Sequence, residues 1–195
     1  MSFQINMPKT RDYSQKIVKQ EQIVYLRDAG YKVMDLHLHT SVSYDVIPSF
    51  QVVPRNLYSN MEKKGFDFIT FTDHDTMLAY DDFPEMPANL IPGVEIKIQP
   101  KRVGRYEECH TLHINVYTLN QNQLQDLQYI ASKREFYEFK AYLEASDLPY
   151  QLNHPTWCEL TDKPDWHYLP DIIKEFDVIE ACNYKRSTWH NHITL

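Results

Sequence analysis

Histidine and carboxylate side chains recur at short spacing in the first half of this sequence. His37 and His39 stand two residues apart, and residues 72–76 read Thr-Asp-His-Asp-Thr around His74. Side chains two apart on a strand point the same way, so His37 and His39 can reach one metal ion. Imidazole and carboxylate groups together suit zinc, manganese or iron(II). The residue types and their spacing therefore predict a metal centre.

Strands and helices that alternate along the chain would position these groups. Apolar and β-branched runs predict the strands, Gly30 is placed to end the first helix, and Asn120 is a plausible N-cap for the longest one. The predicted strands are 32–38, 66–72, 89–95, 111–119, 149–153 and 177–181, and the predicted helices are 12–29, 51–64 and 121–146. This alternation indicates an α/β fold with a mainly parallel sheet, in which chemistry gathers at the carboxyl ends of the strands.

Five successive predicted strands each end in, or carry, an imidazole or a carboxylate. These groups are His37 and His39, the 72–76 segment, Glu95, His110 and His113, and His154. Nine histidines scattered at random would not assort to strand ends in this way. We expect His37, His39, His74, Glu95 and His154 to converge on one pocket, and so many ligands suggest more than one ion.

A wider pattern joins these motifs. In chain order it consists of 35–40, Ser43-Tyr44-Asp45, 72–76, Gly93-Val94-Glu95, a histidine on the fourth strand and Asn153-His154-Pro155. Over residues 33–182 this pattern resembles the PHP (polymerase and histidinol phosphatase) superfamily of metal-dependent phosphoesterases. The resemblance implies a distorted (βα)7 TIM-like barrel with two or three divalent ions, zinc, manganese or iron, at its C-terminal face.

The resemblance also implies roles for single residues. The implied metal ligands are His37, His39, Asp45, His74, Glu95, His113 and His154, with Glu95 bridging two ions. Asp73, His74 and Glu95 are the implied catalytic residues, and Asp73 and Asp75 would orient the imidazoles. For the fourth-strand ligand we favour His113, because the run His113-Ile114-Asn115-Val116-Tyr117 resembles the family's histidine followed by an apolar strand. His110 lies three residues away and faces the other side of a regular strand. A bulged strand would make His110 the ligand instead.

The end of the sequence departs from the family pattern. That pattern finishes with an Asp-x-His pair on a seventh strand, whereas here only His190-Asn191-His192 follows, after no predicted strand. We expect six strands, with the place of the seventh vacant or filled from outside residues 1–195. This favours the interpretation that the sequence is part of a longer protein. Glu180 is expected to line the pocket rather than bind an ion.

The predicted activity is that of an enzyme, a metal-dependent phosphoric ester hydrolase that uses metal-activated hydroxide. Its substrate would be small and phosphorylated, such as a nucleotide, a sugar phosphate or a histidinol phosphate-like compound. Arg102, Lys185 and Arg186 are candidates for phosphate contact, and Ser41 and Ser43 are expected to be loop hydrogen-bonding residues. The alternatives are an amidohydrolase-type metal hydrolase, which would normally show a bridging lysine, a nuclease, and a non-catalytic module with the PHP fold.

The chain as a whole sets further bounds. Its 195 residues suit one PHP-type domain, with a helical extension over 1–31 and a barrel core over 32–182. The net charge of −7 disfavours long nucleic acid as a partner, because such binding relies on Lys and Arg. Three cysteines without a CxxC pair argue against a zinc ribbon and favour a reducing compartment. A polar N-terminus and the lack of an apolar run of about 20 residues predict a cytoplasmic protein without a membrane segment. The oligomeric state stays open.

Overall fold

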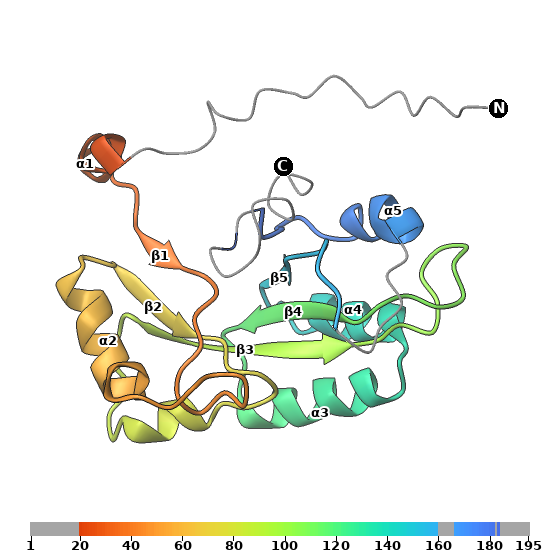
Figure 1. The fold of residues 1–195 in the computed structure, drawn as a ribbon, viewed down its shortest axis with the longest axis horizontal. Helices are drawn as coiled ribbons and strands as arrows, with labels where there is room; N and C mark the ends of the chain where they lie inside the picture. The colour runs from red at the N-terminus through yellow and green to blue at the C-terminus, as the bar shows by residue number, and fades with distance from the viewer. Residues whose placement is uncertain (1–19, 160–165, 182, 184–195) are drawn as a thin grey trace. The chain divides into compact units, whose positions relative to one another are not determined.

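A computed structural model describes residues 20–159, 166–181 and 183, which fall into two units, one ending at Lys32 and one beginning at Val33 (Figure 1). The first unit contains helix α1 (Gln20–Asp28). Gly30, at φ 91°, ends it, because its N–H donates to Arg27 O at 2.8 Å and Tyr31 N–H donates to Leu26 O at 2.9 Å. The predicted role of Gly30 is confirmed. Residues 12–19 of the predicted helix lie outside the described residues.

The second unit is built on one five-stranded sheet. Its strands lie in chain order, β1 (Met34–Asp35), β2 (Phe68–Phe71), β3 (Leu90–Ile98), β4 (Leu112–Tyr117) and β5 (Tyr150–Asn153) (Figure 1). β1, β2 and β3 pair in parallel, but β4 is antiparallel to both β3 and β5. The prediction of a mainly parallel sheet is therefore wrong at β4, which is antiparallel to both of its neighbours. Residues 99–111 contain a tight turn at Val103–Tyr106 instead of the helix that a parallel crossover usually needs.

The described part of this unit also contains helices. They are α2 (Pro54–Lys63), α3 (Gln121–Ser132), α4 (Phe136–Ala145) and α5 (Leu169–Ile173), with 3-10 turns at Phe50–Val52, Leu78–Asp82 and Trp166–Tyr168. The single helix predicted over 121–146 is wrong, because Arg134 takes a left-handed φ of 64° and breaks it. Tyr142 Oη donates to Asp126 Oδ2 at 2.7 Å, so α4 folds back along α3. With two antiparallel helices between β4 and β5, the chain enters β5 at the end of the sheet where β4 finished. β5 is therefore antiparallel to β4.

Residues alternate between the two faces of the sheet, as strand geometry requires. One face is apolar and packs with α3 and α4; it includes Val94, Ile96, Ile98, Leu112, Ile114, Val116 and Leu152. The opposite face is polar and buried; it includes Glu95, His113, Asn115, Gln151 and Asn153. Buried polar side chains normally need hydrogen-bond partners, and this is the face that carries the candidate site.

The sheet curls into a partial barrel around this polar face. Asn115 Nδ2 and Tyr117 Oη of β4 donate to Leu36 O, which follows β1, at 2.8 Å and 2.7 Å. Two strands separate β4 from β1, so only a curled sheet allows these bonds. The predicted strand 177–181 forms one parallel bridge, Leu152 to Ile179, beside β5. A barrel of seven strands stays a prediction.

The apolar residues form two clusters that divide within β3. The first cluster consists of Met61, Ile69, Phe71, Ala79, Tyr80 and Leu90. The second begins at Val94 and extends to Phe176. Glu95 therefore stands at the boundary between the two. Within the described residues, no helix has the length and apolar character needed to cross a membrane.

Candidate metal centre

The polar face is centred on Glu95, which is fully buried. Five histidines surround its carboxylate. Oε2 lies 2.9 Å from His39 Nε2, 3.1 Å from His37 Nε2 and 3.4 Å from His74 Nδ1. Oε1 lies 3.0 Å from His113 Nδ1 and 3.6 Å from His154 Nε2. We call these five histidines and Glu95 the histidine cluster; it brings together six of the seven residues that the resemblance gives as ligands.

Strand directions explain why these distant residues meet. His37 and His39 follow β1, His74 follows β2 and pairs with Glu95 in a parallel bridge, and His154 follows β5. His113 instead stands at the start of β4. Because β4 runs the other way, its start lies beside the ends of β3 and β5, where His113 pairs with Lys97 and Asn153.

An amide network holds Glu95 in place. Asn153 Nδ2 donates to Glu95 Oε1 at 2.9 Å and to Asn115 Oδ1 at 2.8 Å, and both amides are buried. The sequence motif includes Asn153, but its role was missed. The available signal was the alternation of polar and apolar residues along strands that are otherwise apolar, with Asn115 and Asn153 on the polar side.

Asp45, the seventh implied ligand, lies at the edge of the histidine cluster. Its Oδ1 is 3.3 Å from His39 Nδ1, and its Oδ2 is 3.8 Å from His74 Nε2. Ser43 Oγ donates to Asp45 Oδ1 at 2.6 Å and lies 3.0 Å from His39 Nδ1. The Asp45 side chain is 41% exposed, so it marks the side of the cluster that solvent reaches.

Asp73 and Asp75 occupy different places from the cluster carboxylate. Asp73 accepts hydrogen bonds from Thr40 N at 2.5 Å and from Thr40 Oγ1 at 2.7 Å, so it fastens the loop that carries His39. Burial raises the pKa of Asp73 despite these two bonds. Asp75 takes a left-handed φ of 54°, and its N–H donates to Glu95 O at 2.9 Å. A catalytic role for Asp73 stays a prediction.

The two histidines near the fourth strand are separated by the structure. His113 lies on β4 and contacts Glu95. His110 precedes the strand; its Nε2 is 3.3 Å from Pro155 O, and its ring packs edge-on against Tyr168 at 4.9 Å. It is therefore His113 that the strand directs at the histidine cluster.

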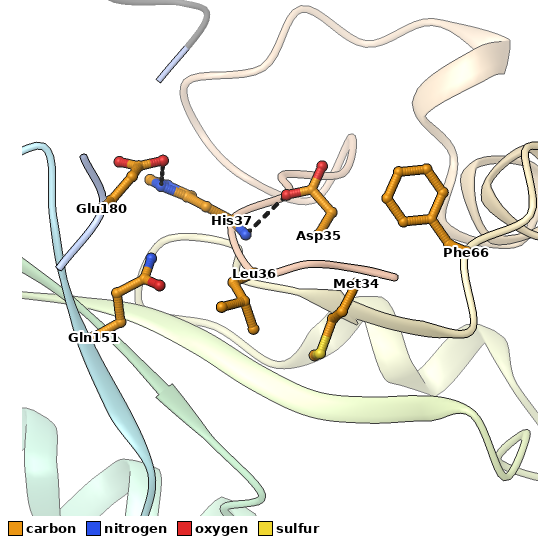
Figure 2. A pocket seen from close by; sticks show the side chains of 7 residues that line it. All are labelled: Met34, Asp35, Leu36, His37, Phe66, Gln151 and Glu180. Atoms are coloured by element: carbon orange, nitrogen blue, oxygen red, sulfur yellow. Dashed lines mark hydrogen bonds and ion pairs between the residues drawn. The ribbon is translucent and has the colours of Figure 1, made fainter. Parts of the chain in front are cut away.

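Glu180 binds the outer side of His37. Its Oε1 lies 3.1 Å from His37 Nδ1, and its Oε2 accepts the N–H of His154 at 3.1 Å. Glu180 and His37 line a cavity of about 310 Å³, together with Met34, Asp35, Leu36, Phe66 and Gln151. Figure 2 shows His37 turned toward Glu180 at one end of this cavity. Glu180 thus lines a cavity beside the cluster and also holds an imidazole of the cluster, and its predicted role as a pocket residue rather than an ion ligand stays a prediction.

The charges of the histidine cluster are unequal. Burial raises the pKa of Glu95, but hydrogen bonds from four surrounding histidines outweigh it and hold the pKa well below its usual value. Burial lowers the pKa of His37, yet the carboxylates of Glu180 and Glu95 outweigh it and raise the pKa to about 10. Burial and the neighbouring imidazoles lower the pKa of His74 to about 4. Imidazoles crowded around one anion thus differ in their affinity for protons.

The donor set fits divalent metal ions. His37 Nε2, His39 Nε2 and Glu95 Oε2 are 2.9–3.1 Å apart, and ligand atoms about 2.1 Å from one ion at right angles lie about 3 Å apart. His74 Nδ1 is buried without a hydrogen bond. Among the described residues, four overlapping groups could hold an ion: His37–His39–Glu95, His74–Glu95–His113, His39–Asp45–His74 and His37–His154–Glu180. Imidazole and carboxylate donors suit zinc, manganese or iron.

The structure does not place the cations proposed from the sequence for phosphate contact at the histidine cluster within the described residues. Arg102 Nε donates to Gly104 O at 3.0 Å in an exposed loop. Lys185, Arg186, His190 and His192 lie outside the described residues. Sequence reasoning missed Lys97, although it follows Glu95 by two positions and so shares the polar face of β3.

No protein-family model matches this sequence, and a search of curated proteins finds no match. The fold is similar to that of a protein from Bifidobacterium adolescentis, provisionally described as a metal-dependent phosphoesterase, with a TM-score of 0.55 and 13% identity over 84% of this chain and 82% of the other. It is also similar to an amidohydrolase from Chromobacterium violaceum with bound sulfate and no metal, with a TM-score of 0.51 and 13% identity over 82% of this chain and 80% of the other. These likenesses confirm the α/β fold that the resemblance predicted.

Proposed function

We propose that this chain is a metal-dependent hydrolase that cleaves phosphoesters of a small substrate with two or three bound divalent ions. The observation that carries the proposal is the buried carboxylate of Glu95, surrounded by five histidines on both of its oxygens. Such a group is costly to bury unless cations satisfy it. Zinc, manganese and iron(II) are the ions that this donor set favours.

In this proposal some residues of the site would hold ions, one would orient a histidine ring, and one lies where substrate would enter. Bound ions would supply an activated water and positive charge for the phosphoryl oxygens. Oε1 and Oε2 of Glu95 face different histidines, so both oxygens would be available to hold ions. Glu180 holds the imidazole of His37 in one orientation. Asp45, the exposed member of the set, lies where a substrate would enter.

An amidohydrolase-type reaction is the second candidate. The likeness to the Chromobacterium violaceum amidohydrolase favours it. Against it, the described side chains that contact Glu95 are five histidines and Asn153, and no lysine is among them. The net charge of −7 further supports a small substrate over a long polynucleotide. Nucleotides, sugar phosphates and histidinol phosphate-like compounds are the substrates to test.

The test compares phosphoester with amide hydrolysis. The protein is loaded with Zn²⁺, Mn²⁺ or Fe²⁺ and assayed with p-nitrophenyl phosphate, bis(p-nitrophenyl) phosphate and a panel of amides and lactones. We expect phosphoester hydrolysis that falls at least about a hundredfold in Glu95→Gln and His74→Ala. Glu135→Gln removes an exposed carboxylate and serves as the control.

Each other result points elsewhere. Hydrolysis confined to amides or lactones would establish the amidohydrolase alternative. Ion binding without hydrolysis of any of these compounds would support a non-catalytic module.

A further inference from the structure

In the part of the chain that the structure describes, Lys97 is the cation that lies beside the histidine cluster. It follows Glu95 by two positions on β3, so both side chains leave the strand on the polar face. The Lys97 side chain is 30% exposed, whereas Glu95 is buried. The ammonium group therefore stands on the solvent side of the cluster.

Two contacts tie Lys97 to histidines of the cluster. Lys97 Nζ lies 3.3 Å from Glu159 Oε1, and the same oxygen lies 3.3 Å from His113 Nε2. Lys97 Nζ also lies 5.1 Å from the centre of the Tyr44 ring, which stacks on His74 at 4.8 Å. The ammonium is thus held between a carboxylate that touches His113 and a ring that touches His74.

The surroundings of Lys97 are strongly acidic. Glu159 pairs with its ammonium group, Asp75 interacts with it electrostatically, and Glu95 lies two positions away on the same face of β3. A lysine side chain is charged at neutral pH, so Lys97 offers a positive charge where a phosphorylated substrate would otherwise face carboxylates.

We propose that Lys97 binds a phosphoryl oxygen of the substrate, which takes the place of Glu159 on its ammonium group, with the Tyr44 ring as the adjoining wall. The inference rests on the proposed function, because it assigns the anion contact of that same site. The ion pair with Glu159 is partly exposed and so contributes little stability. A phosphate group carries up to two negative charges and so forms stronger charge-assisted hydrogen bonds with an ammonium group than one carboxylate does. It can therefore replace Glu159 as the partner of Lys97.

The test measures binding of inorganic phosphate to the metal-loaded protein. We expect Lys97→Gln to weaken phosphate binding at least tenfold and to raise KM more than it lowers kcat, with the metal content unchanged. Lys97→Arg should retain most of the affinity. Lys101→Gln is the matched control, because Lys101 forms an exposed ion pair with Glu135 on the surface.

Glu159→Gln gives a second and independent readout. Removal of the competing carboxylate should tighten phosphate binding, whereas a purely structural ion pair would only lower stability. Unchanged phosphate affinity in both Lys97→Gln and Glu159→Gln would overturn the inference and leave the proposed function intact. If Lys97→Gln does not fold, an unchanged affinity in Glu159→Gln decides against it. If the wild-type protein binds phosphate through Lys97 but hydrolyses no phosphoester, the proposed function fails and the anion site stands.

Discussion

At the scale of single residues, the two oxygens of Glu95 face different parts of the chain. Oε2 contacts His37, His39 and His74, which precede Glu95 in the sequence. Oε1 contacts His113 and His154, which follow it. A carboxylate divided in this way can join two sets of imidazoles, and it needs further residues to fix how each ring is turned.

Glu180 should influence metal affinity through His37. In Glu180→Gln the amide nitrogen would meet the N–H of His154 or the Nδ1 of His37, so the ring of His37 would lose its fixed orientation. We expect metal affinity to fall by about ten- to a hundredfold with the number of bound ions unchanged, as measured by calorimetry and elemental analysis. Glu144→Gln, an exposed substitution on α4, is the control. The loss of one whole ion would mean that Glu180 is itself a ligand.

His74 should make the metal-free protein sensitive to acid. Its pKa is lowered to about 4 from 6.5, chiefly by burial, so the folded state favours the neutral ring. The free energy of unfolding keeps its full value with respect to His74 above pH 6.5. It falls as the pH drops toward 4, by on the order of 3 kcal/mol, because the unfolded chain binds the proton first. Urea unfolding of the chelator-treated protein at a series of pH values measures it. His74→Asn should show a shallower decline over the same range, and an equal decline would assign the effect to other groups.

At the scale of elements, the direction of β4 determines which of its residues reach the site. The turn at Val103–Tyr106 and the paired helices α3 and α4 each reverse the chain, so β4 alone runs against its neighbours. The alternation of faces was readable from the sequence and sends His110 and His113 to opposite sides of a strand, while the choice of His113 came from the resemblance. The reversed direction of β4 was not readable from the sequence. The break at Arg134 depends on packing between α3 and α4, such as the hydrogen bond from Tyr142 to Asp126.

The start of α3 offers a test of local stability. Asn120 Oδ1 accepts the N–H groups of Asn122 and Gln123 at 3.0 Å and 3.1 Å, and Gln123 Oε1 accepts the N–H of Asn120 at 2.9 Å. The predicted N-cap is confirmed. Asn120→Ala should lower the free energy of unfolding by about 1 kcal/mol, measured by denaturant titration. Asn120→Asp should retain most of it, and an equal loss in both variants would contradict a capping role.

At the scale of the whole molecule, bound ions should stabilise the fold. An ion that binds only the folded state adds about 2.7 kcal/mol when its concentration is a hundred times its Kd. We expect chelation to lower the Tm of the wild-type protein, and readdition of Zn²⁺ or Mn²⁺ to restore it, in scanning calorimetry. Glu95→Gln should show little difference between the two conditions. A Tm that is insensitive to chelation in the wild type would argue against resident ions.

Much of the candidate site follows from the sequence, but its connections do not. His37, His39, His74 and Glu95 could be grouped because each stands at a predicted strand end of the same sheet. The pairing of Glu180 with His37 spans 143 positions and depends on how the chain returns after β5. The contact of Lys97 with Glu159 likewise joins a strand to a loop, and loop conformations follow from tertiary packing rather than from a local pattern.

The division of the apolar core at β3 has a consequence for the order of folding. The buried apolar residues up to Leu90 form one cluster and those from Val94 onward form another, with Met77 packed against both. The first half can therefore collapse, with three of the cluster histidines, while the second half is still being synthesised. Ions bound across Glu95 would then join the halves into one cooperative unit. Native-state hydrogen exchange should show two groups of amides with different opening free energies in the chelated protein, and a single group once ions are bound.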